Sequence, residues 1–151
     1  MKELKFPEMT GEQVIKYRDS ILSNKSVALH IRRGNFVGLG IQLDSKYYFD
    51  ALRDISKKYD DFTVYVFSDD LYWCNQHANE IGLNFAPKIE YVSGNVKNGS
   101  FMDLQLMSMC EVLIPANSAF SFLAALMSER IESFKNPWTG KWVTRDEKNE
   151  V

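Results

Sequence analysis

Short strand-like runs alternate with helix-like segments along this chain, and this alternation restricts its fold more than any other feature. Four runs of β-branched, aromatic or aliphatic residues have strand length: 27–31, 62–68, 88–94 and 111–116. A helical segment separates each run from the next, as in parallel strands joined by right-handed crossovers. Because most of the runs are apolar on both faces, helices are expected on both sides of the sheet. The sequence predicts an α/β fold with a doubly wound, mostly parallel sheet of about four to five strands.

Helix-start signals lie before and between these runs. Thr10, with Gln13 three residues later, forms a capping pattern, and Gly82 is a typical helix stop. The helices are predicted over 10–22, from 44 or 45 onward, over 69–82, from 100 onward and over 117–130. The glycine-punctuated segment 34–40 is expected to be a loop.

The chain of 151 residues, 45% of them hydrophobic, is long enough for one buried core. We expect a single α/β domain over residues 1–142 and a disordered polar tail over 143–151. Cys74 and Cys110 are far apart in the sequence and are expected to be buried free thiols.

The overall charge and hydrophobicity exclude several classes of partner. A net charge of −2 provides no basic field for nucleic acid, so any anion must be bound locally. No apolar run approaches the roughly 18 residues of a membrane span. The N-terminal stretch MKELKFPEMTGEQ lacks the apolar region of a signal peptide, and we expect a cytoplasmic protein.

A histidine and two arginines follow the first run, in the stretch VALHIRRGN. If the chain stays extended, His30 and Arg32 point to one side and Arg33 to the other. A guanidinium group fits the oxygens of a phosphate and stays charged at any ordinary pH. The alternative is that both arginines pair with carboxylates such as Asp69 or Asp103.

A second polar cluster, Ser68, Asp69 and Asp70, follows the second run. An Asp at this position is a common N-cap, and capping alone would explain one of the two carboxylates. The other would remain able to accept hydrogen bonds from N–H or O–H groups of a ligand. Because ligands of open α/β sheets bind beyond the carboxyl ends of the strands, we expect this cluster near the arginines.

A third cluster, Asn117, Ser118 and Ser121, lies where the fourth run turns into a helix. Asn and Ser are also good helix caps, so capping is again the alternative interpretation. A helix N-terminus nevertheless offers unpaired backbone N–H groups and partial positive charge to a phosphate oxygen. The two serine hydroxyls would add donors beside it.

Other common catalytic patterns are lacking in the sequence. His77 has no neighbouring His, Cys or carboxylate at metal-ligand spacing, so we expect no metal site. We also find no G-x-G-x-x-G, P-loop, H-E-x-x-H or nucleophile elbow. Trp73 is expected to pack against the sheet.

The three clusters, in this order and spacing, resemble the GDP-fucose-dependent fucosyltransferases, especially the bacterial α-1,2-fucosyltransferase family. The matching stretches are HIRRGN from His30, YY from Tyr47, FSDDLYWC from Phe67, DLQLMSMC from Asp103 and NSAFS from Asn117. Together they cover about residues 26–122.

The resemblance implies the donor-binding half of a GT-B glycosyltransferase, in which two α/β domains face each other. Arg32 would hold the diphosphate of GDP-fucose with help from Ser118 and Ser121, while His30 and Asp69 would contact the guanine. The donor-contacting set is expected to be His30, Arg32, Arg33, Ser68, Asp69, Asp70, Asn117, Ser118 and Ser121, with Arg32 and Asn35 at catalytic positions. The resemblance implies no metal or cofactor, because the guanidinium and the helix dipole would stabilise the leaving GDP. Transfer to a hydroxyl of a glycan acceptor would invert the sugar.

Two departures from the family pattern bear on activity. Asn35 stands where the family motif ends in Asp, and an amide has no useful basicity. The residues ahead of the motif are too few to form an acceptor-side domain, so we expect that domain to be missing. The isolated chain would then be weakly active or inactive, or would work with a separate acceptor-binding domain or chain. The alternatives are an inactive nucleotide-binding remnant and a phosphate-binding α/β interaction module.

Overall fold

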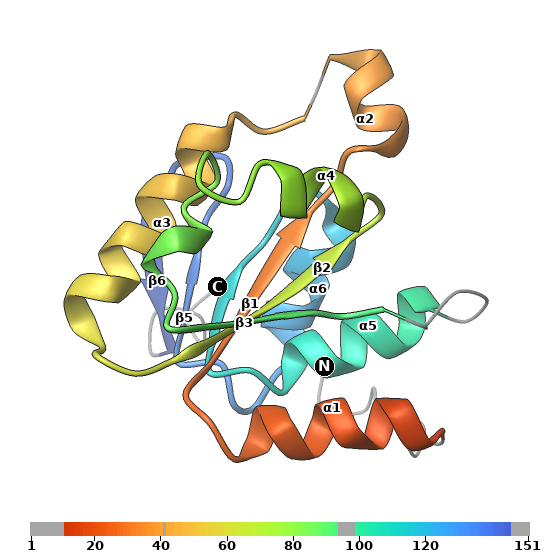
Figure 1. Cartoon of the computed structure of the whole chain (residues 1–151), viewed down its shortest axis with the longest axis vertical. Coiled ribbons are helices and arrows are strands. Elements are labelled where there is room, and N and C mark those ends of the chain that lie inside the picture. Colours follow the sequence, from red (N-terminus) through yellow and green to blue (C-terminus); the bar gives the residue numbers. More distant parts are fainter. Residues whose placement is uncertain (1–10, 41, 94–98, 146–151) are drawn as a thin grey trace.

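A six-stranded sheet forms the centre of the structure, a computed structural model that describes residues 11–40, 42–93 and 99–145. The strands are β1 (Ser26–Ile31), β2 (Thr63–Ser68), β3 (Lys88–Tyr91), β4 (Val112–Ile114), β5 (Ser133–Lys135) and β6 (Trp142–Thr144). Their spatial order is β3-β2-β1-β4-β5-β6 (Figure 1). Strands β1 to β5 run parallel, and β6 pairs with β5 in the antiparallel direction. The predicted α/β class and mostly parallel sheet are confirmed, with six strands instead of four to five.

Helices cover both faces of this sheet (Figure 1). They are α1 (Glu12–Leu22), α2 (Gly34–Leu39), α3 (Ser45–Lys58), α4 (Leu71–Gln76), α5 (Gly99–Ser108) and α6 (Ala119–Met127), with a 3-10 turn η1 at Leu83–Phe85. Helices α3 and α4 pack on one face, and α1, α5 and α6 pack on the other. This arrangement on two faces is the doubly wound pattern that the alternation predicted.

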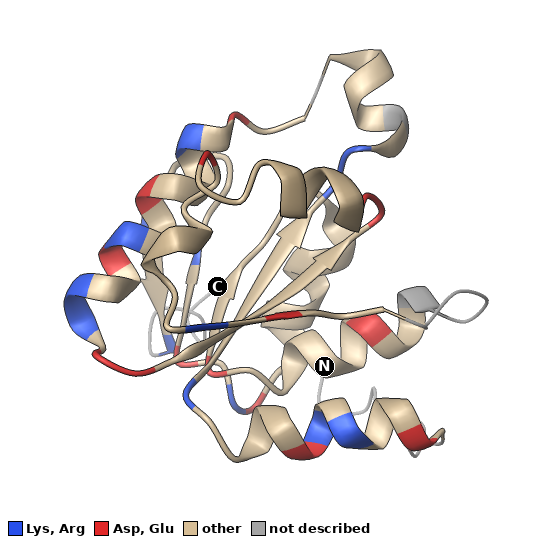
Figure 2. Cartoon of the chain, viewed as in Figure 1, with Lys and Arg blue, Asp and Glu red and all other residues tan. Residues whose placement is uncertain are grey.

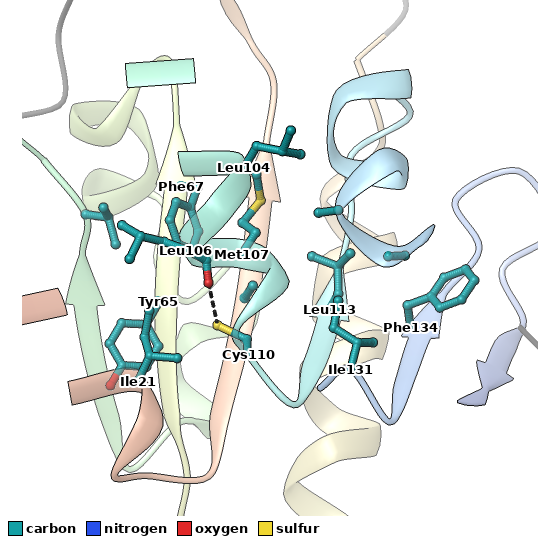
Figure 3. Close-up of a cluster of buried hydrophobic side chains, with 14 of the residues drawn as sticks. Ile21, Tyr65, Phe67, Leu104, Leu106, Met107, Cys110, Leu113, Ile131 and Phe134 are labelled. Carbon is teal, nitrogen blue, oxygen red and sulfur yellow. Dashed lines mark hydrogen bonds between the residues drawn. The ribbon is translucent and has the colours of Figure 1, made fainter. Parts of the chain in front are cut away.

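Strand β1 contributes to both cores because all six of its residues are buried. Its side chains alternate: Val27, Leu29 and Ile31 belong to the core under α3 and α4, and Ala28 to the core under α1, α5 and α6. Figure 3 shows part of the second core, in which the Cys110 thiol donates to the Leu106 carbonyl. Cys74 and Cys110 are both free and buried, as predicted.

The segment 34–40 was expected to be a loop, and this expectation is wrong. Its first six residues form helix α2. At the start of this helix, the Val37 N–H donates to the Arg33 carbonyl at 2.7 Å. Gly40 ends the helix with φ of 69°, a left-handed conformation that glycine adopts without steric cost. The glycines therefore mark the ends of a short helix in this segment.

The helix predicted over 69–82 is shorter than expected. Helix α4 ends at Gln76, and the ring Nδ1 of the following His77 lies 2.9 Å from the Trp73 carbonyl oxygen. Gly82 does not stop this helix; it precedes η1 with φ of 84°. An added Cβ there would lie 2.9 Å from the Phe49 Cα, so Gly82 lets the chain approach α3 closely.

The domain boundary predicted at residue 142 falls inside β6, and Val143 and Thr144 belong to that strand. Its pairing with β5 extends the sheet into the segment predicted as a polar tail. The rest of that tail from 146 onward, and the predicted cap Thr10, lie outside the described residues. The N-cap of α1 is Gly11.

Candidate functional site

The carboxyl ends of β1, β2 and β4 meet at one edge of the sheet. In the strand order, β1 is central, with β2 on one side and β4 on the other. The chain winds outward in one direction from β1 to β3 and in the other from β4, so the winding reverses between β1 and β4. Ligands of open α/β sheets bind at such a reversal, beyond the strand ends. The three polar clusters identified in the sequence all follow these three strands.

His30 is buried near the end of β1, with 5% of its surface exposed. Its ring centroid lies 5.6 Å from that of Phe120 on α6. Burial, and to a lesser extent the neighbouring charge of Arg32, lowers its pKa from 6.5 to about 3. The ring is therefore neutral at pH 7. Within the described part of the chain, its buried Nδ1 has no hydrogen-bond partner.

The two arginines after β1 contact different aromatic rings. The Arg33 guanidinium lies over the Trp73 ring at 3.8 Å, and the Arg32 guanidinium lies over the Phe36 ring at 4.5 Å. Carboxylate pairing, the alternative interpretation, is present as well: Arg32 Nε lies 3.5 Å from Asp69 Oδ2, and Arg33 Nε lies 3.9 Å from an oxygen of Asp70. Both separations exceed a normal charge-assisted hydrogen bond. Figure 2 shows the basic segment after β1 close to the acidic one after β2.

The Ser68–Asp70 cluster organises the backbone at this edge. Asp70 caps α4 by accepting from the Trp73 N–H at 3.0 Å, which is the capping role considered from the sequence. The Ser68 hydroxyl oxygen accepts from the Asp70 N–H at 3.0 Å. Asp69 Oδ1 accepts from the Arg33 N–H at 2.8 Å and so ties the loop after β1 to the loop after β2.

Gly34 is required by this tie between the two loops. A Cβ at Gly34 would lie 2.5 Å from Asp69 Oδ2, too close for any side chain unless the carboxylate moved. The carboxylate is held in place by the Arg33 N–H, so glycine is the residue that fits there. Apart from the glycine itself, no local pattern indicates this contact.

Helix α6 begins at the same edge, directly after β4. Ser118 is its N-cap and accepts from the Phe120 N–H at 3.1 Å. Ser121 is fully buried, and its hydroxyl donates to the Ala116 carbonyl at 3.3 Å. This hydrogen bond braces the turn before α6, and the ligand contact expected for Ser121 stays a prediction. Asn117 is partly exposed beside it.

Two further features of this edge were not foreseen. The Trp73 ring packs on the sheet face under α3 and α4, as expected, and it also stacks with the Arg33 guanidinium and with the His77 ring, whose centroid lies 4.4 Å away. A hollow of about 370 Å³ opens beside this stack, lined by Arg33, Gln42, Leu43, Asp44, Ser45 and Trp73. Only the predicted cap Asp44 drew attention to this segment in the sequence.

Two other kinds of site are not found among the described residues. Among residues 11–40, 42–93 and 99–145, no three His, Cys, Asp or Glu residues gather as metal ligands would. No helix in these same ranges is both long and apolar enough to cross a membrane. Asn35 lies in the first turn of α2, and its side chain is outside the described part of the structure.

Comparison with known proteins relates this chain to glycosyltransferases. The chain is 31% identical over 147 residues to an α-1,2-colitosyltransferase of Escherichia coli, covering 83% of this chain and 49% of that protein. Its fold resembles the fucosyltransferase NodZ from Bradyrhizobium, with a TM-score of 0.58 and 17% identity over 87% of this chain and 45% of NodZ. A NodZ α-1,6-fucosyltransferase crystal soaked with GDP-fucose gives the same TM-score at 13% identity, covering 89% and 49% of the two chains.

The family assignment follows from the sequence match. The chain spans about half the length of the curated relative and of the NodZ chains. The model of Glycosyl transferase family 11 matches residues 12–133, which include every strand from β1 to β4 and all three polar clusters. The resemblance to fucosyltransferases is thereby confirmed, and the chain belongs to glycosyl transferase family 11.

Proposed function

We propose that this chain binds GDP-fucose at the edge where β1, β2 and β4 end, as the donor-binding half of a metal-independent, inverting fucosyltransferase. The observation that carries the proposal is the meeting of the Arg32-Arg33 loop and the α6 start at the reversal of the sheet. Family membership and the NodZ crystal soaked with GDP-fucose support the same donor.

The diphosphate is assigned to Arg32 and the start of α6. The 3.5 Å separation between Arg32 Nε and Asp69 is long enough for a phosphate oxygen to compete with the carboxylate. Backbone N–H groups at the start of the nine-residue helix α6, capped by Ser118, add partial positive charge. Together they would stabilise the charge that develops on the leaving GDP.

The guanine is assigned to His30 and Asp69. A neutral imidazole offers one N–H and one acceptor nitrogen, and the buried Nδ1 of His30 lacks a hydrogen-bond partner within the described residues. Asp69 uses Oδ1 for the Arg33 N–H, and its Oδ2 would accept from the N–H groups of the base. His30 and Asp69 would be held in place by their neighbours Arg33, Ser68, Asp70 and Asn117.

In the proposed reaction, an acceptor hydroxyl attacks the anomeric carbon of the sugar. The new bond joins the acceptor oxygen to that carbon, and the bond from the carbon to the β-phosphate oxygen breaks. GDP leaves with the electron pair, and the acceptor proton passes to solvent. Displacement in one step requires the acceptor to approach from the side opposite the diphosphate.

Calorimetric titration of the full chain with GDP, GDP-fucose and ADP tests the donor assignment. We expect GDP and GDP-fucose to bind, with ADP at least about tenfold weaker. Arg32→Ala should weaken GDP at least about tenfold, the loss of one charged contact. Arg18→Ala is the matched control, because Arg18 lies on α1 and pairs with Asp19. Lack of GDP binding by the folded wild type would refute the proposal, and equal binding of ADP would favour a general phosphate-binding module.

The transferred sugar is open to a direct comparison. One relative is named for colitose and the NodZ structures for fucose, and both are 6-deoxy sugars. Competition between GDP-fucose and GDP-colitose for the same site measures the preference. Tighter binding of GDP-colitose would transfer the proposal from fucose to colitose.

A second candidate function is nucleotide binding without sugar transfer, and Asn35 is the observation that favours it. An amide cannot remove a proton from an acceptor hydroxyl. We would measure release of GDP from GDP-fucose, with a panel of free sugars, for the wild type and for Asn35→Asp. Turnover by the wild type would exclude the inactive alternative, and turnover by Asn35→Asp alone would identify Asn35 as its cause.

A further inference from the structure

The hollow beside Arg33 lies across the β1 loop from the donor elements described above. Arg33 and Trp73 form one wall, and Gln42 to Ser45 form the other, just before and at the start of α3. Helices α3 and α4 cover one face of the sheet, whereas α6, with Ser118 and Phe120, covers the other. The hollow is therefore separate from the proposed diphosphate position, although both lie at the same edge.

The lining of the hollow is polar and close to neutral. It combines a guanidinium, an amide, a carboxylate and a hydroxyl from Arg33, Gln42, Asp44 and Ser45, and the two charges offset each other. The Asp44 carboxylate would repel an anion, and an apolar ligand would bury these groups without partners. A neutral ligand with many hydroxyls fits this chemistry best.

Several of these polar groups can hydrogen-bond a ligand. Asp44 Oδ1 accepts from the Lys46 N–H at 3.1 Å, and its second oxygen has no partner within the described residues. The same holds for the Gln42 amide and the Ser45 hydroxyl, both of which reach solvent. The Trp73 ring contacts both the Arg33 guanidinium and the His77 ring, and these contacts hold it in place as a wall of the hollow.

We propose that this hollow binds a neutral pyranose of the glycan acceptor, through Gln42, Asp44 and Ser45 against the Arg33-Trp73 wall. The proposal rests on the proposed function, because displacement in one step puts the acceptor opposite the diphosphate. Its volume of about 370 Å³ lies within the range of small-molecule sites and accommodates a sugar ring. The donor's own sugar has the same chemistry, so the experiment must distinguish the two sources.

The test follows the indole N–H signals of the three tryptophans in the ¹⁵N-labelled full chain. Trp73→Phe assigns the Trp73 signal. With GDP present in excess, methyl glycosides of galactose, glucose, mannose and N-acetylglucosamine are titrated to millimolar concentrations. We expect at least one to shift the Trp73 signal saturably, with Trp138 and Trp142 unchanged.

Two variants test whether the named residues bind the sugar. Gln42→Ala should weaken the glycoside at least about threefold, while GDP affinity stays unchanged. Gln76→Ala is the matched control, since this exposed glutamine of α4 does not line the hollow. Asp44→Asn keeps a capping side chain at the start of α3 and should weaken the glycoside similarly.

The outcomes separate this inference from the donor assignment. If GDP binds but no glycoside shifts Trp73, the acceptor assignment is wrong and the proposed function stands. A shift with GDP-fucose but not with GDP or free glycosides would assign the hollow to the donor sugar and overturn the proposal. Stronger binding of galacturonate than of methyl galactoside would overturn the neutral-ligand argument. Failure of GDP itself to bind would remove both proposals.

Discussion

At the amino-terminal edge of the sheet, the Lys25 Nζ lies 3.0 Å from a Glu111 oxygen and 2.9 Å from a Glu132 oxygen. At the carboxyl-terminal edge, the arginine-aspartate separations are 3.5 Å and 3.9 Å. Although burial alone would lower it, the hydrogen bonds to Glu132 and Glu111 raise the pKa of Lys25 above its ordinary value. The charged side chains at the amino-terminal edge of the sheet therefore form close ion pairs with one another.

The carboxyl-terminal edge keeps groups that its own side chains do not satisfy. Within the described residues, the buried His30 Nδ1 and Arg33 Nε have no hydrogen-bond partner. Buried polar atoms are normally paired, and exceptions concentrate where a protein binds something. The comparison teaches that the charged side chains are closely paired at one edge, whereas the other edge, where we propose the donor site, has looser ion pairs and buried nitrogens without a partner among the described residues.

Among the substitutions compared at pH 7, Lys25→Met should have the largest effect on stability. The substitution breaks two charge-assisted hydrogen bonds and should lower the free energy of unfolding by about 2 kcal/mol in urea denaturation. GDP affinity should stay within about twofold of the wild type. Lys46→Met is the control, because its pair with Asp50 is exposed and should contribute less than about 0.5 kcal/mol. Loss of GDP binding by the folded Lys25→Met variant would contradict the conclusion that this edge serves only the stability of the fold.

His30 should make stability depend on pH. The unfolded ring takes up a proton as the pH falls below 6.5, whereas the buried ring resists protonation until about 3. The native state should lose up to about 1.4 kcal/mol per pH unit as the pH falls from 6.5 toward 3. His30→Phe, measured by urea denaturation between pH 7.5 and pH 4.5, should remove this part of the slope. Parallel pH profiles for the two proteins would show that the ring is not held neutral.

Gly34→Ala should have the smallest effect on stability and a specific effect on binding. The new Cβ must displace the Asp69 carboxylate, while alanine favours the helix, so the net stability change should be below about 1 kcal/mol. GDP affinity should fall by about threefold, because the displaced Asp69 carboxylate no longer holds the loops after β1 and β2 together. Gly38→Ala is the control in the same helix, because its Cβ would meet nothing within 4 Å. Equal GDP affinities of the two variants would count against Asp69 as part of the site.

Local signals predicted the features that depend on local physics. Asp44 caps α3 as expected, because a capping side chain and helical spacing both lie within one segment. The alternation of strands and helices also predicted at which edge of the sheet the candidate site lies, since parallel strands place their carboxyl ends together.

Contacts between distant segments could not be read in the same way. Nothing near Trp73 in the sequence indicates that Arg33 will stack on it, because the two are brought together by pairing of β1 with β2. Strands β5 and β6 have three residues each, too few for a periodic pattern, and their pairing defines them. Helix α2 reads as a loop because three glycines have poor helix propensity.

The hydrogen bond from the Arg33 amide to Asp69 has a consequence for how fast a nucleotide can enter. Because the backbone beneath the guanidinium groups is already anchored to the neighbouring strand, a phosphate can replace a carboxylate by side-chain rotation alone. In this described loop the backbone is already held, so little conformational entropy would be lost there on capture. Association of the nucleotide should then be limited by diffusion. Added salt should slow it, because salt screens the attraction between the phosphates and the arginines.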